Sequence, residues 1–231
     1  QDDGSMARMP DLEVFAKTHG LKICSVERII EYRRRHEKLV KRVAETSLPT
    51  EFGPYRLYAY ETTVDDYHHV ALVLGDITPA DEVLVRVHSE CLTGDVFGSL
   101  RCDCRDQLET ALSRIGLEEH GLVLYLRQEG RGIGLLNKLR AYGLQDRGLD
   151  TVEANEALGF RDDEREYSIA AHMLHSLKVR SVRLLTNNPR KIDELTRYGV
   201  KISGRMPHVI PPNEFNRFYL ETKQEKSGHA L

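Results

Sequence analysis

Residues 84–104 read LVRVHSECLTGDVFGSLRCDC and residues 125–134 read YLRQEGRGIG, and the rest of the chain is organised around these two stretches. Three cysteines, Cys91, Cys102 and Cys104, fall within the first. The Cys-x-Cys pair keeps two sulfurs close together, and a loop containing Gly94 and Gly98 can fold back to bring in the third. Zinc favours tetrahedral thiolate coordination, and three protein ligands leave a fourth position for water or substrate. Water bound there becomes a nucleophile near neutral pH.

Other interpretations of the cysteines stay open at this point. A closed structural zinc site could take His88 or another group as its fourth ligand. The cysteines could also be small buried apolar residues, or form a disulfide. The fourth cysteine, Cys24, lies far from the cluster, and this usage suits a reducing cytosol and a metal better than a disulfide framework. We therefore expect a cytoplasmic protein.

The second stretch contains the glycine-rich run from Glu129 to Gly134. It follows the apolar, strand-like residues 122–126 and precedes a helical pattern. Its backbone N–H groups and the helix N-terminus could therefore receive phosphate. Such a run is weak on its own, because glycines also mark ordinary tight turns. The Gly-x-Gly-x-Gly spacing also differs from the Gly-x-Gly-x-x-Gly of dinucleotide-binding dehydrogenases. A phosphate cradle beside a metal site is a stronger indication than either alone.

Strands alternate with helices from residue 83 to residue 200, after an antiparallel start with strands at 55–60 and 70–74. We therefore predict an α/β to α+β domain with a mixed β-sheet and flanking helices. Helices are expected at 101–117, at 135–145 with Leu135, Leu136 and Leu139 as the apolar stripe, and at 190–197. The sequence DTVEAN (150–155) is too polar for a core strand and is expected to be a loop. The polar tail from residue 213 predicts a terminal helix and a mobile end.

The first forty residues predict two short helices. Pro10 starts the first and Gly20 stops it, residues 21–24 predict a short strand, and Ser25 can cap the second helix. The basic run at 33–35 is expected to be a solvated helix face. A chain that begins at Gln1 suggests a cut segment.

Composition limits the class of protein. The chain has 231 residues, 40% of them hydrophobic and 30% charged, which is typical of a soluble globular protein. No apolar run approaches the roughly 18 residues of a spanning helix, and the polar, acidic N-terminus does not predict a signal peptide. A net charge of −3 argues against general nucleic-acid binding. We expect neither a nucleic-acid nor a membrane partner.

Four motifs in order, RVHSECLTGDVFGSLRCDC (86–104), RQEGRGIGL (127–135), DTVEAN (150–155) and LLTNNP (184–189), resemble GTP cyclohydrolase II, the enzyme family that starts riboflavin synthesis. The resemblance covers roughly residues 42–231. Residues 1–40 resemble the C-terminal end of 3,4-dihydroxy-2-butanone 4-phosphate synthase, which is often fused upstream, and we assign them no activity. The expected domains are thus a synthase remnant with linker at 1–40 and a GTP cyclohydrolase II domain at 41–231.

The resemblance implies zinc-dependent hydrolysis of GTP. Water activated by zinc on the three cysteines would attack C8 of guanine, the ring would open, and C8 would leave as formate. Zinc deaminases are a chemical parallel. Pyrophosphate would leave separately with the help of Mg²⁺, giving 2,5-diamino-6-ribosylamino-4(3H)-pyrimidinone 5′-phosphate. The family is commonly homodimeric. A rival interpretation is a zinc-stabilised nucleotide-binding module without catalysis.

The resemblance also implies site residues. Asp163, Arg165 and Tyr142 would be catalytic, the aspartate as a proton acceptor. Because a protonated guanidinium is a poor nucleophile, we expect Arg165 to stabilise the phosphoryl transition state electrostatically. The residues that would bind GTP are Arg86, Val87, His88, Ser89, Glu90, Gln107, Glu129, Gly130, Arg131, Thr151, Thr186 and Lys191. One departure is Arg105, which stands where the family usually has glycine.

Overall fold

The computed structural model describes residues 1, 3–78 and 80–228, and the chain divides into two compact units, residues 1–37 and 38–231. The first unit contains α1 (Met9–His19) and α2 (Val26–His36). Gly20 ends α1 in the left-handed conformation, and the Ser25 hydroxyl caps α2 by accepting from Arg28 N at 3.2 Å. The predicted strand at 21–24 is wrong: these residues have no partner strand and are irregular. Among the residues of the two helices only Ala16 is buried.

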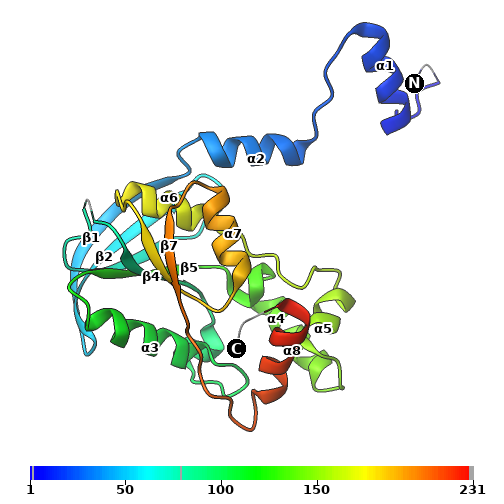
Figure 1. The fold of residues 1–231 in the computed structure, drawn as a ribbon. Coiled ribbons are helices and arrows are strands. Elements are labelled where there is room, and N and C mark those ends of the chain that lie inside the picture. The colour runs from blue at the N-terminus through cyan, green and yellow to red at the C-terminus, as the bar shows by residue number, and fades with distance from the viewer. Residues whose placement is uncertain (2, 79, 229–231) are drawn as a thin grey trace. The chain divides into compact units, whose positions relative to one another are not determined.

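The second unit is built on a seven-stranded sheet with the order β1-β2-β3-β5-β4-β6-β7 (Figure 1). Strands β1, β2, β3 and β5 pair antiparallel, whereas β5, β4, β6 and β7 pair parallel. The sheet is therefore mixed, as predicted. The strands are β1 (Val40–Thr50), β2 (Gly53–Thr62), β3 (His69–Leu74), β4 (Val83–Ser89), β5 (Gly121–Leu126), β6 (Val182–Leu185) and β7 (Ile202–Met206).

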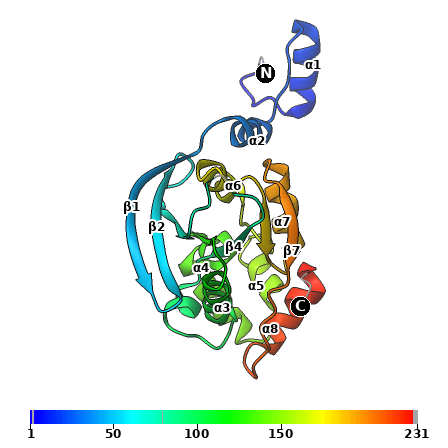
Figure 2. The same ribbon diagram turned by 60° about the vertical axis from the view of Figure 1, so that its left-hand side comes forward.

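Helices cover both faces of this sheet (Figures 1 and 2). Helices α6 (Ser168–Ser176) and α7 (Pro189–Arg197) pack on one face, where their apolar residues join Val83, Val85 and Val87 of β4 in the larger core. Helix α3 (Cys104–Gly116) packs on the other face, where Leu84 contributes to a smaller core. This alternation follows from the two-residue period of a strand.

The remaining helices lie around the carboxyl ends of the parallel strands. They are α4 (Leu135–Gln145), α5 (Thr151–Ala157) and α8 (Arg217–Ser227). Helix α5 corrects the prediction of a loop at 150–155: Asp150 caps it through Val152 N and Glu153 N, which makes its polar start a helix signal. The predicted apolar stripe of α4 is also wrong. Leu136 and Leu139 are exposed, and the helix buries Lys138 and Ala141 instead.

Strands β4, β5 and β6 run parallel and end at the same edge of the sheet. The loops that leave them contain the cysteine stretch, the glycine-rich turn and the Thr186-Asn187-Asn188 segment. Binding sites of parallel sheets form outside these carboxyl ends. The fold thus brings three motifs that are far apart in the sequence to one place. None of the described helices is both long and apolar enough to cross a membrane.

Candidate active site

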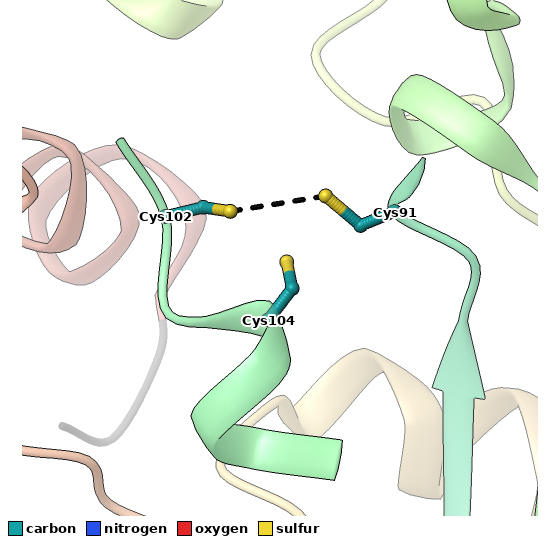
Figure 3. Close-up of side chains that lie close together, drawn as sticks. All are labelled: Cys91, Cys102 and Cys104. Carbon is teal, nitrogen blue, oxygen red and sulfur yellow. Dashed lines mark hydrogen bonds between the residues drawn. The ribbon is translucent and has the colours of Figure 1, made fainter. Parts of the chain in front are cut away.

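The three clustered cysteines come together at this edge of the sheet. Cys91 follows β4, Cys102 precedes α3 and Cys104 begins it, and their sulfurs point toward one another (Figure 3). The Cys91 and Cys102 sulfurs are 3.8 Å apart, and all three sulfurs lie within 4.8 Å of one another. Tetrahedral zinc with bonds of about 2.3 Å requires sulfurs about 3.8 Å apart. The Cys91–Cys102 spacing matches this value and the third sulfur lies close by, so the trio could hold a metal ion such as zinc; no disulfide joins these cysteines.

Gly94 makes this approach possible. A Cβ atom at this position would lie 2.8 Å from Cys102 Sγ and 3.1 Å from Cys91 Sγ. Real Cβ atoms do not come so close to sulfur, so any other residue would push the sulfurs apart. The loop of residues 92–101 is thus shaped around the space between the sulfurs.

The ionisation of the trio also suits a cation. Hydrogen bonds from the Cys102 and Cys104 thiols lower the pKa of Cys91, and the nearby Lys138 ammonium lowers it further. Hydrogen bonds with Cys102 and Cys91, together with burial, raise the pKa of Cys104 well above its ordinary value. Without a metal, one thiolate is therefore stable and a second is not. A divalent cation would remove this conflict, because it binds thiolates and not thiols.

Asp95, which the sequence did not single out, holds the cysteine loop against the sheet. Its buried carboxylate accepts from Cys91 N at 2.9 Å and from the Tyr125 hydroxyl at 2.8 Å, and it faces His88 Nε2 at 3.1 Å. His88 is therefore engaged with Asp95. Among the described residues, the candidate metal ligands are the three cysteines, and His88 is not in that group.

A cleft opens beside the sulfurs, and we call it the zinc cleft. The proposed site residues that line it are Ser89, Glu90, Cys91, Cys102, Cys104, Glu129, Gly130, Arg131, Tyr142, Thr151 and Arg165. Tyr142 lies at its wall with its hydroxyl 3.4 Å from Thr93 Oγ1. Burial raises the pKa of Tyr142 to about 12, so its phenol keeps its proton at neutral pH and could donate it.

The Glu129 carboxylate is held in place by three hydrogen bonds from the protein. It accepts from Leu92 N at 2.6 Å, from Gly130 N at 2.7 Å and from Lys138 Nζ at 2.8 Å. These contacts join the cysteine loop, the glycine-rich turn and α4. In this structure Glu129 thus connects the parts of the zinc cleft. Gly130 and Arg131 both have positive φ, which gives the turn its sharp bend.

A second pocket adjoins the first and is strongly basic; we call it the cationic pocket. Four of its lining residues carry positive side chains: Arg86, Arg165, Lys191 and Lys223. It is also lined by His88, Ser89, Cys104, Gln107 and Thr186 of the predicted site. The two pockets share Ser89, Cys104, Arg165 and Tyr219, so a ligand can extend from the sulfurs into the basic region.

The basic side chains are buried and fixed. Arg86 donates to Leu185 O at 3.0 Å and to the Gln107 side chain, and Lys191 Nζ donates to Val87 O at 2.8 Å. Burial, with Arg86 and Arg165 close by, lowers the pKa of Lys191 well below its ordinary value. Such a crowd of buried cations is costly unless an anion joins it. The pocket is therefore preorganised for a multiply charged anion.

Arg165 is held by Asp163. Its Nε and NH2 atoms donate to the two carboxylate oxygens at 2.9 and 2.6 Å, and the pair lies in an irregular segment before α6. Burial alone would raise the pKa of Asp163, but the charge and hydrogen bonds of Arg165 lower it below its usual range. A carboxylate in this state is a weak proton acceptor, so its evident effect is to orient the guanidinium.

Two of the proposed site residues line neither pocket. Asp163 lies behind Arg165, and Val87 packs its side chain into the larger core, leaving only its carbonyl for Lys191. The departure at Arg105 does not reach the sulfurs: its side chain is exposed and pairs with Glu109 at 3.3 Å.

Sequence reasoning missed several side chains here. Lys138 is 3.1 Å from Cys91 Sγ, and Asp103 accepts from Gln107 and from Lys223. The sequence could have indicated Lys138, because it lies four residues before Tyr142 and therefore on the same face of the helix as that tyrosine. For Asp103 the signal was its place between two candidate ligands.

Residues 41–207 match the GTP cyclohydrolase II family model. The chain is 56% identical over 230 residues to the riboflavin biosynthesis protein RibBA of Bacillus mycoides (strain KBAB4) and 55% identical over 231 residues to RibBA of Bacillus subtilis (strain 168). Each alignment covers 100% of this chain and 58% of the relative, so the chain spans well under two thirds of the length of these relatives.

Among solved structures, RibBX of A. baumannii, described as a two-domain 3,4-dihydroxy-2-butanone 4-phosphate synthase, matches with a TM-score of 0.51. The match has 24% sequence identity and covers 89% of this chain and 52% of that one, so it bears on the fold alone. The match to the family model spans most of the second unit, including the cysteine cluster and both pockets up to residue 207. On this ground the chain belongs to the GTP cyclohydrolase II family.

Proposed function

We propose that this chain hydrolyses GTP to 2,5-diamino-6-ribosylamino-4(3H)-pyrimidinone 5′-phosphate, formate and pyrophosphate, the first step of riboflavin biosynthesis. The observation that carries the proposal is the junction of the two pockets. A three-sulfur cluster lies at one end and a group of buried cations at the other. A purine nucleoside triphosphate has a matching arrangement, with a ring to be opened at one end and a triphosphate at the other.

Cys91, Cys102 and Cys104 would hold the zinc ion. When bound, zinc supplies Lewis acidity, which makes water a nucleophile near neutral pH. The protein's own residues would donate protons and bind the substrate. Tyr142 lies beside the sulfur cluster with its proton retained and would donate it to the opening ring. Glu90, Glu129, Gly130, Arg131 and Thr151, which line the zinc cleft, would surround the base and sugar.

In the cationic pocket, Arg86, Gln107, Thr186 and Lys191, with His88 and Ser89, would bind the triphosphate. Arg165 reaches both pockets and would stabilise charge on the α-phosphate as pyrophosphate leaves. Asp163 would act by orienting Arg165. Val87 would contribute through its backbone, which holds Lys191. We propose Mg²⁺ as the counterion of the triphosphate, supported by the family relationship alone.

Two further proposals rest on the same resemblance, and a third rests on the cysteines. Residues 1–40 would be the remnant of a 3,4-dihydroxy-2-butanone 4-phosphate synthase domain with its linker, and residues 41–231 the catalytic domain. The chain would act as a homodimer. The free thiols of the cluster support a cytoplasmic location, where thiols stay reduced.

The test is direct. The purified chain is incubated with GTP, Zn²⁺ and Mg²⁺, and formate and pyrophosphate are measured separately. We expect both products, and we expect Cys102→Ser to lose formate release together with bound zinc. Binding of zinc and GTP without formate would show a nucleotide-binding module instead. Full activity in a zinc-free sample would overturn the metal assignment.

A further inference from the structure

Helix α8 brings two side chains into the site from outside the segment that the family model matches. Tyr219 lines both the zinc cleft and the cationic pocket, and Lys223 lines the cationic pocket. The two residues are four apart, so they share one face of the helix. That face is turned toward the site.

Lys223 is nearly buried, with 8% of its surface exposed. Its ammonium lies 3.1 Å from Asp103 Oδ1 and 4.3 Å from the centre of the Tyr219 ring. Asp103 stands between two of the cysteines and also accepts from Gln107, which in turn accepts from Arg86. The Asp103 carboxylate is thus connected to two buried basic side chains, directly to Lys223 and through Gln107 to Arg86.

The charge in the pocket exceeds what these carboxylates balance. Four basic side chains line it, and the Asp103 and Asp163 carboxylates stand against them. A buried ammonium next to other cations is unfavourable unless an anion completes its surroundings. Lys223 has three N–H donors, and Asp103 takes one of them. Within the described residues, Asp103 is the acceptor found for this ammonium, and its other N–H groups can donate to phosphate oxygens in the pocket.

We propose that α8 completes the substrate site, with Lys223 binding the triphosphate and Tyr219 positioning Lys223 at the junction of the two pockets. This inference rests on the proposed function. The Tyr219 ring stacks under the Lys223 ammonium and lies 5.9 Å from the Arg131 guanidinium. An aromatic ring attracts cations that lie over its face, and this ring lines both pockets.

Helix α8 makes a further ion pair away from the two pockets. Lys226, one turn beyond the site-facing residues, pairs with Asp150, the residue that caps α5. Thr151, the first residue of α5, lines the zinc cleft. Both lysines therefore hold α8, Lys223 through buried Asp103 and Lys226 through Asp150, so Tm and zinc content must be recorded beside ligand binding to separate loss of docking from loss of an anion contact.

The experiment compares Lys223→Met and Lys223→Arg with the wild type and with Arg217→Met, a control that removes an exposed charge from the same helix. Binding of inorganic tripolyphosphate and of guanosine is measured by calorimetry, with zinc content and Tm recorded for each variant. For Lys223→Met we expect tripolyphosphate binding to weaken about 10- to 100-fold, the loss of one charge-assisted hydrogen bond. Guanosine binding and zinc content should stay unchanged, and Lys223→Arg should recover part of the loss.

The outcomes are decisive in both directions. Tripolyphosphate binding to Lys223→Met at wild-type strength, or equal losses for tripolyphosphate and guanosine with a lowered Tm, would overturn the assignment. So would a wild-type chain that does not bind tripolyphosphate. These binding measurements do not depend on turnover. A wild-type chain that releases no formate yet loses tripolyphosphate binding on Lys223→Met would refute the proposed function and retain Lys223 as an anion ligand.

Discussion

The Lys138 ammonium lies 3.1 Å from Cys91 Sγ and 2.8 Å from Glu129 Oε1, so one buried cation joins the sulfur cluster to the glycine-rich turn. We expect Lys138→Met to weaken zinc binding by about 10- to 100-fold, as loss of a group that supports a metal ligand does. The reason is that the Cys91 thiolate loses the positive charge that helps lower its pKa, so protons compete better with zinc.

Competition with a coloured chelator at several pH values measures this effect. The deficit should shrink as pH rises, since protons then compete less. Arg140→Met removes an exposed charge from the same helix and should bind zinc as the wild type does. A zinc affinity of Lys138→Met equal to that of the wild type at every pH would contradict the prediction.

Gly94 permits a second prediction. In Gly94→Ala the new methyl group would meet two of the three sulfurs at 2.8 and 3.1 Å, so the cluster must open. We expect the variant to remain folded and to retain little zinc after dialysis, measured by elemental analysis. Gly143→Ala is the control, because its Cβ would meet nothing within 4 Å. That change should leave zinc content intact and stabilise α4 slightly. Equal zinc content in both variants would disprove the steric argument.

The third prediction concerns Asp95. In Asp95→Asn, one amide oxygen must serve the three donors that the carboxylate serves now, and an NH₂ group faces at least one of them. We expect the free energy of unfolding to fall by about 1.5–3 kcal/mol, the range for hydrogen bonds to a charged group. Urea unfolding of the zinc-free chain measures it, and the exposed Asp66→Asn should change little. A loss as small as that of the control would mean that Asp95 does not hold the loop.

The fourth prediction is a pH dependence. Burial, with Arg86 close by, lowers the pKa of His208 from 6.5 to about 3, while Nε2 donates to Gln107 O at 2.8 Å. The folded state keeps this imidazole neutral, whereas the unfolded chain protonates it below about pH 6.5. Its contribution is therefore present above that pH and is lost as pH falls toward 3, at up to about 1.4 kcal/mol per pH unit.

His208→Gln keeps a side-chain N–H donor and cannot titrate, so its stability should fall less steeply between pH 6.5 and pH 4.5. Urea unfolding across this range is the measurement. The wild type will also respond through buried His69 and His88, whose pKa values burial lowers as well. The exposed His68→Gln is the control and should follow the wild-type curve. Parallel curves for His208→Gln and the wild type would refute the prediction.

The sequence predicted most of the sheet and the cysteine cluster, because strand periodicity and ligand spacing are local signals. It did not predict β1, an edge strand that pairs only with β2 and exposes most of its residues. Such a strand lacks the alternation that burial imposes. The apolar stripe predicted for α4 was wrong for a related reason: Lys138 is buried there by its tertiary partners, the Cys91 sulfur and Glu129, and not by its own hydrophobicity.

The site was predictable where a motif was compact and not where a residue came from far away. Lys223 is 120 positions from Asp103 in the chain. The sequence of a polar terminal helix does not indicate which of its lysines will be buried in a distant site. Asp95 sits within the cysteine stretch, yet its importance comes from three donors on the sheet and loop that only the fold brings together.

Strand β4 contributes to both stability and chemistry through its two sides. Val85 and Val87 face the larger core, while Arg86 lies in the cationic pocket and His88 beside the cysteine loop. A shift of one residue in the pairing register of β4 would turn the valines toward the pockets and the polar side chains toward the core. Such a shift would therefore destroy the core packing and the binding site together. Single replacements, by contrast, can act on one trait alone. Positions 83, 85 and 87 offer a route to tune thermal tolerance, and positions 86 and 88 a route to alter ligand preference.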